Sequence, residues 1–230
     1  MFSEKIYRSN KFSAYSSRIR VLLRWLTTRS RVTNSTERET IVSDDIVERF
    51  PKPSPELQCL IDKVPDTRLI LYYRETHRSI NMEWKSWAYD MMEVGYQQPS
   101  IIQLAGEDLT MNPFEFEALV DSVFNELGIH CPQDIGKYQY VLWVACQVVD
   151  GIMSGEKGFY ILAQAAIETN YHDAFMKFYY LEDDADLLRI HQPTSFCFGD
   201  GNMREDNIEE WMALYFKKLL CVNTTPDVIL

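Results

Sequence analysis

Residues 112–128, NPFEFEALVDSVFNELG, carry both a helix start signal and a helix stop signal. Asn112 suits the N-cap, Pro113 the first helical position and Glu115 the third, where a carboxylate favours the helix start. Gly128 suits the position after the last turn. The apolar side of this helix is expected to be formed by Phe114, Leu119, Val123, Phe124 and Leu127.

The same punctuation recurs along most of the chain. Ser79 or Asn81 can cap a helix that ends at Gly95, Asp134 can cap one that ends at Gly151, and Ser154 can cap the next. Further helices are predicted within 99–106, 172–188 and 204–220. Connections this short favour antiparallel neighbours. The sequence therefore predicts an all-α fold, a single multi-helix domain of antiparallel helices with a basic N-terminal helical extension.

The region before residue 81 is harder to interpret. Residues 67–73, TRLILYY, resemble a strand, but a lone strand has no partner, so a helix is the alternative. Residues 44–50 and 57–64 suggest short helices, separated by the stiff linker PKPSP. We therefore expect a basic N-terminal helix and polar linker over 1–56 and an acidic all-helical domain over 57–230.

Charge is unevenly distributed along the sequence. Residues 1–33 contain eight basic residues and one acidic residue, whereas 34–230 contain 15 basic and 33 acidic residues. An acidic body repels nucleic acid and anionic membranes and attracts basic partners. The simpler explanation, that acidity maintains solubility, stays open.

The basic segment 16–31 places Ile19, Leu22, Leu23 and Leu26 at helical spacing among arginines. Arg24 interrupts any apolar core of a secretory signal, and the segment is too short to span a membrane. It can be a transit-like peptide, a membrane-surface helix or a helix docked on the acidic body. Charge complementarity favours the last, so membrane contact through 16–31 is possible but not favoured.

Motifs for catalysis, cofactors or metals are not apparent. His130 and Cys131 are adjacent, which does not place the imidazole on the sulfur, and the four histidines form no HExxH pair. There is no phosphate-binding glycine pattern, and neither EDDAD (182–186) nor FGDGN (198–202) matches a calcium loop. Five cysteines without a CxxC motif indicate a reduced, cytoplasmic protein. We therefore expect no cofactor, no metal and no enzymatic activity.

Acidic residues are densest between 173 and 210, where ten acids accompany three bases. Aromatic residues lie nearby, and aromatic anchors within a charged rim are typical of tight interfaces. Trp211 and Tyr215 can equally belong to the core. The predicted surface for a basic protein partner consists of Glu182, Asp183, Asp184, Asp186, Phe196, Phe198, Asp200, Glu205, Asp206, Glu209 and Trp211.

Three strings, WAYDMMEVGYQQPSIIQLAG, NPFEFEALVDSVFNELGI and REDNIEEWMALYF, resemble a pattern found in small acidic all-helical bacterial proteins, over about residues 80–220. In size, acidity and lack of a catalytic motif such proteins are similar to the immunity proteins of bacterial toxin systems. The resemblance implies a non-catalytic protein that neutralises a cognate toxin or effector by direct binding. The alternatives are a metal-dependent hydrolase with a site assembled across helices, or an effector chaperone or adaptor that uses residues 16–31.

Overall fold

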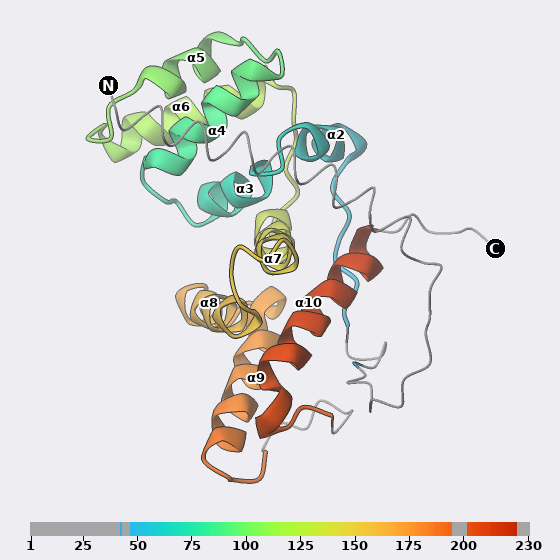
Figure 1. Ribbon diagram of the computed structural model, residues 1–230. Helices are drawn as coiled ribbons and strands as arrows, with labels where there is room; N and C mark the ends of the chain where they lie inside the picture. The colour runs from blue at the N-terminus through green and yellow to red at the C-terminus, as the bar shows by residue number, and fades with distance from the viewer. Residues whose placement is uncertain (1–41, 43–46, 195–201, 225–230) are drawn as a thin grey trace, which may run out of the picture. The chain divides into compact units, whose positions relative to one another are not determined.

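The computed structural model describes residues 42, 47–194 and 202–224 (Figure 1). The chain divides into two units, Met1–Glu39 and Thr40–Leu230, and the described residues all belong to the second. The predicted basic segment 16–31 and the predicted site residues Phe196, Phe198 and Asp200 lie outside the described residues. No helix among the described residues is long and apolar enough to cross a membrane.

Helices form all of the regular secondary structure in the described part of the chain, which confirms the all-α prediction. In chain order they are α2 (Pro55–Lys63), α3 (Thr67–Glu75), α4 (Met82–Glu93), α5 (Pro99–Gly106), α6 (Pro113–Glu126), α7 (Ile135–Val149), α8 (Gly155–Glu168), α9 (Asp173–Arg189), the short 3-10 helix η3 (Glu205–Asn207) and α10 (Ile208–Thr224).

Several helix starts form as predicted. The side chain of Asn81 accepts a hydrogen bond from the backbone of Trp84, Asn112 accepts from Phe114, and Ser154 accepts from Lys157. Each cap satisfies a backbone N–H that has no partner within its own helix. These local signals therefore fix where α4, α6 and α8 begin.

Other sequence predictions need correction. Residues 67–73 are helical, as part of α3, and residues 47–50 are not helical. Phe114 is 83% exposed, because it lies on the opposite side of α6 from Leu119, Val123 and Phe124, which are buried as predicted. The residues that α6 buries are Phe116, Leu119, Val120, Val123 and Phe124.

Two hydrophobic cores hold the helices together. The first lies among α2 to α6 and includes Leu57, Leu60, Trp84, Trp87 and Phe124. The second lies among α7 to α10 and includes Phe159, Phe178, Trp211, Tyr215 and Phe216. Helix α7 packs closely on α3: a Cβ atom at Gly136 would lie 2.5 Å from the carbonyl oxygen of Leu71. Glycine at this position therefore allows the two backbones to meet.

Residues that precede α2 also contribute to the second core. Val42 and Val47 are buried in the second core, and the carbonyl of Val42 accepts a hydrogen bond from Lys218 Nζ. Further along, Asn223 Oδ1 accepts from the Phe50 backbone at 2.7 Å. Val42 and Phe50 therefore contact α10.

Candidate functional site

Three helices are capped at their N-termini by glutamates from distant parts of the sequence. Glu75 Oε1 accepts from the Gly136 backbone N–H at 2.7 Å, and Glu209 Oε1 accepts from that of Gly155 at 2.7 Å. Glu126 accepts from both the backbone N–H and the hydroxyl of Ser100, at 3.1 and 2.7 Å. A carboxylate at a helix start satisfies unpaired N–H groups and the positive end of the helix dipole. These acids therefore have a structural role.

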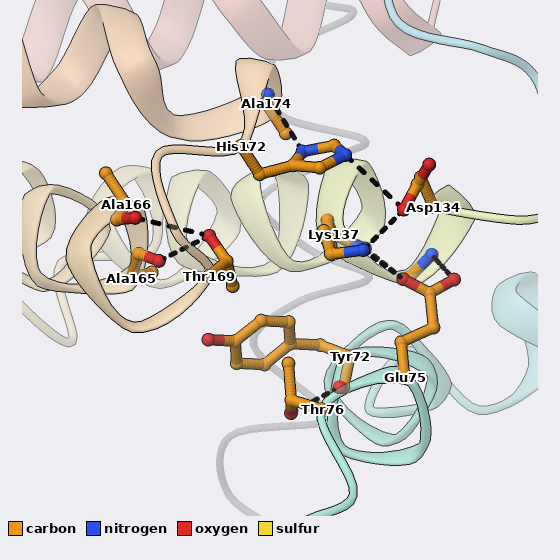
Figure 2. A network of polar contacts seen from close by, with 11 residues as sticks. Tyr72, Glu75, Thr76, Asp134, Lys137, Ala165, Ala166, Thr169, His172 and Ala174 are labelled. Carbon is orange, nitrogen blue, oxygen red and sulfur yellow. Dashed lines mark hydrogen bonds and ion pairs between the residues drawn. The ribbon is translucent and has the colours of Figure 1, made fainter.

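The cap at α7 belongs to a wider polar network, shown in Figure 2. Lys137 Nζ contacts Asp134 and lies 3.8 Å from Glu75 Oε2, while His172 Nε2 lies 3.4 Å from Asp134 Oδ1. His172 Nδ1 accepts from the Ala174 backbone and so caps α9. Because Nδ1 accepts, we infer that the neutral ring carries its proton on Nε2, toward Asp134.

Asp134 does not cap α7 with its side chain, contrary to the prediction. Its backbone is left-handed, with φ of 64°, whereas an N-cap residue usually has extended backbone. Its carboxylate instead faces Lys137 and His172, and the hydrogen bond from Lys137 lowers the pKa of Asp134. Burial raises the pKa of Glu75, and the backbone N–H bonds only partly oppose this.

A cleft of about 500 Å³ lies beside this network. Its charged walls are already paired: Arg74 lies 3.1 Å from Asp121, and His77 lies 3.0 Å from Glu117. Cys131 also lines the cleft, and burial raises the pKa of its thiol, which makes it a poor nucleophile. Across the described ranges, no group of three or more His, Cys, Asp or Glu residues is placed to hold a metal ion.

The second candidate site is the acidic surface, which we define as a shallow depression together with the exposed acids of α9. The depression has a volume of about 420 Å³, and its lining contains five carboxylates and no Lys or Arg. The acids of the depression are Glu156, Glu205, Asp206, Glu209 and Glu210, and those of α9 are Asp183 and Asp186.

Exposed ion pairs connect the two parts of the acidic surface. Arg189 lies 3.1 Å from Glu156 and 2.5 Å from Asp186, so one guanidinium joins α8 to α9. Two further pairs lie nearby, His191 with Glu205 at 3.0 Å and Arg204 with Asp206 at 3.2 Å. Exposed pairs of this kind contribute about 0–1 kcal/mol each. A basic partner can therefore compete for these carboxylates at little cost.

Glu182 differs from the other acids predicted to contact a partner. Its Oε2 atom is buried without a hydrogen-bond partner in the described part of the molecule. Burial raises its pKa to about 7; Arg189 opposes this rise, while Asp186 and Glu156 add to it. Burial therefore favours the uncharged form of Glu182, so this residue adds less negative charge than the sequence predicts.

Two predicted partner-binding residues, Trp211 and Asp184, need correction because they are buried. Trp211 is 1% exposed, because it lies on the inner side of α10 and stacks on Tyr215, with ring centroids 5.7 Å apart. The core alternative is therefore the right one for this pair. Asp184 is 3% exposed and faces inward, and the carboxylate of Glu209 is engaged at the start of α8. Trp211 and Asp184 are therefore buried, whereas Glu209 is exposed and its carboxylate accepts two backbone hydrogen bonds.

Exposed aromatic and aliphatic residues on α8 and just after it were not predicted. Tyr160 and Ile167 on α8 and Tyr171 just after it are 55%, 49% and 49% exposed. The sequence suggests a buried helix at 154–170, since most of its residues are apolar. On a helix with 3.6 residues per turn, Tyr160 and Ile167 lie on a different side from the buried Phe159 and Leu162. The helical periodicity of the sequence could therefore have identified the exposed residues.

No family model, curated protein or solved structure matches this chain.

Proposed function

We propose that this protein is a non-catalytic binding protein that holds a basic protein partner on its acidic surface. The observation that carries the proposal is the depression lined by five carboxylates without a Lys or Arg, next to Asp183 and Asp186. Negative charge gathered on one surface attracts a basic partner at long range and speeds encounter.

The specific form of the proposal is a bacterial immunity protein that neutralises a cognate toxin or effector by covering it. Such a role requires a surface whose charge and shape complement the partner and apolar residues that anchor it. It requires no cofactor and no reactive side chain. A cytoplasmic location belongs to the same proposal, and five cysteines without a CxxC motif are compatible with it.

Co-expression tests this proposal directly. The full chain is produced together with the basic protein encoded by the adjacent gene, and the pair is purified and assayed for protection of the host cell. We expect a complex that survives gel filtration at micromolar concentration and weakens as salt increases. Absence of both complex and protection would contradict the proposed function.

A matched pair of charge reversals locates the binding. Glu210 is an exposed acid of the acidic surface, and Glu93 is an exposed acid at the end of α4. We expect Glu210→Lys to weaken the complex and Glu93→Lys to leave it unchanged. Equal effects would show that only net charge matters, which would contradict binding at the acidic surface.

The metal-dependent hydrolase is the alternative function, and its support is limited to the charged lining of the cleft beside α3 and α7, because no three His, Cys, Asp or Glu residues of the described ranges are placed to hold a metal ion. Charged residues from α3, α6 and α7 converge on one cavity, as a site assembled across helices requires. Metal analysis of the purified full chain, followed by hydrolase assays with added divalent ions, tests this candidate. Stoichiometric metal that is lost on Asp134→Asn would support it, whereas no metal uptake would contradict it.

A further inference from the structure

One carboxylate next to the acidic surface lacks the hydrogen bonds that stabilise a buried charge. Glu182 of α9 is half-buried, and its Oε2 atom is buried without a hydrogen-bond partner. The following residue, Asp183, is exposed to water, and Glu209 of the acidic surface accepts two backbone hydrogen bonds. A buried carboxylate with neither water nor a donor beside it favours its neutral form, and burial raises the pKa of Glu182 to about 7.

The charge on Glu182 is coupled to two acids of the acidic surface. Asp186 and Arg189 follow Glu182 by four and seven residues, so all three lie on one side of α9. Arg189 lies 3.1 Å from Glu156 of α8 and 2.5 Å from Asp186. After burial, which is the main cause of the raised pKa of Glu182, attraction by Arg189 opposes the rise, and repulsion by Asp186 and Glu156 adds to it.

The 3-10 helix η3 adds two more acids to this surface, and each has a partner of its own. Glu205 and Asp206 line the depression; Glu205 lies 3.0 Å from His191, and Asp206 lies 3.2 Å from Arg204. The charges that act on the Glu182 carboxyl come from α8 and from α9 itself.

Positive charge that reaches the acidic surface changes this balance. A cation beside Asp186 and Glu156 cancels part of their repulsion on Glu182 and adds an attraction, so the ionised form of Glu182 becomes more favourable. The coupling is reciprocal: if a bound cation favours loss of the proton, loss of the proton favours the bound cation by the same free energy.

We propose that Glu182 couples the binding of a basic partner at the acidic surface to the release of a proton, so that the complex tightens as pH rises through neutrality. This inference rests on the proposed function and adds a form of regulation to the same surface. The proton passes from the Glu182 carboxyl to the solvent, and the fold does not need to rearrange. The number of exposed acids decides where the partner binds, and Glu182 decides how its affinity depends on pH.

The first test follows the Glu182 carboxyl carbon by NMR in the full chain, from about pH 5 to about pH 9, with Glu182→Gln to identify its signal. We expect a titration midpoint of about 7 in the free chain. With an excess of a peptide of about six arginines, we expect a lower midpoint. A midpoint that the peptide leaves unchanged, or one typical of an exposed glutamate, would overturn the coupling.

The second test measures the Kd of the same peptide, labelled for fluorescence anisotropy, at about pH 6 and about pH 8. Glu182→Gln removes the titrating group. Asp206→Asn is the matched control, because it removes an acid of the same surface whose side chain is 76% exposed. His191 is present in all the proteins, so the comparison isolates Glu182.

We expect the wild-type Kd to be about threefold to fivefold lower at the higher pH. Asp206→Asn should bind more weakly with the same ratio, and Glu182→Gln should show a ratio at least about twofold smaller. Equal ratios in the wild type and Glu182→Gln would overturn the coupling and leave the proposed function in place. A peptide that binds at neither pH would overturn it too, and the co-expression experiment judges the proposed function separately.

Discussion

Glu182 and Glu209 belong to the same acidic region of the sequence, but their carboxylates have different physical roles. Glu209 accepts two backbone hydrogen bonds at the start of α8, so it is committed to the fold. Glu182 has a buried, unpartnered oxygen and a pKa raised to about 7. Asp183, the residue after Glu182 on α9, is an exposed acid. The availability of each acid to a partner is therefore decided by burial and hydrogen bonding, and the number of acids in the sequence does not reveal it.

The raised pKa of Glu182 predicts a pH-dependent effect of Glu182→Gln on stability. The folded state binds this proton more tightly than the unfolded state, whose pKa is 4.5, so the folded state loses stability as pH rises toward about 7. Urea unfolding at about pH 5 and about pH 8 measures the effect. We expect Glu182→Gln to be close to neutral at the lower pH and stabilising at the higher pH. The exposed control Glu93→Gln should show no such difference, and an equal effect of Glu182→Gln at both pH values would contradict its raised pKa.

Because the backbone of α3 lies so close to Gly136, we expect that adding even a methyl group at this position lowers the stability of the fold. In Gly136→Ala the new Cβ would lie 2.5 Å from the Leu71 carbonyl oxygen, which is backbone and cannot rotate away. We expect a loss of about 1–3 kcal/mol in the free energy of unfolding. Gly106→Ala is the matched control, since its Cβ would meet nothing within 4 Å, and it should be neutral or slightly stabilising. Equal unfolding midpoints for the two variants would refute the close approach of α3 and α7.

At the scale of the helices, the same arrangement occurs three times: the N-terminus of one helix is capped by a glutamate from another helix. Glu75 of α3 caps α7, Glu126 of α6 caps α5, and Glu209 of α10 caps α8. At α7 and α8 a glycine lies at the same place, where a Cβ would come within 3 Å of the backbone of the capping helix. The cap and the glycine together therefore fix how closely each of these two helix pairs packs.

Removal of one such cap is expected to destabilise the fold. Glu75→Ala leaves the backbone N–H groups of Gly136 and Lys137 without an acceptor in a half-buried place, which costs about 1–3 kcal/mol. Glu117→Ala removes an acid that forms an exposed pair with His77, and should cost less than about 1 kcal/mol. Chemical unfolding of both variants compares the two. A cost at Glu75 no larger than at Glu117 would show that the cap is unimportant.

The sequence predicts the local parts of these helices and misses the long-range parts. Asn81, Asn112 and Ser154 were predicted as caps and form them, because a cap depends on residues within one turn. The cap from Glu75 to Gly136 joins positions 61 residues apart, and no local pattern encodes it. Within the candidate site, Glu205, Asp206, Asp183 and Asp186 are exposed as predicted. Trp211 was misplaced because a helix-spaced aromatic residue beside acids fits a core and an interface equally well.

At the scale of the whole chain, the predominant feature is the separation of charge along the sequence. The chain carries a net charge of −11 even though its first 33 residues are basic. The five carboxylates of the depression lie at the starts of α8 and α10, where the helix dipoles stabilise them. The fold can therefore maintain a dense negative surface that would otherwise repel itself, and this is the physical basis for attracting a basic partner.

The most direct test of the central claim is the salt-dependent affinity of the complex with the basic partner from co-expression, measured by isothermal titration calorimetry for the wild type, Glu210→Lys and Glu93→Lys. We predict that the affinity of the wild type falls steeply as salt increases, that Glu210→Lys weakens binding at least about tenfold at low salt, and that Glu93→Lys binds like the wild type. An affinity that is independent of salt and equal in all three proteins would contradict the claim that the acidic surface is where the partner binds.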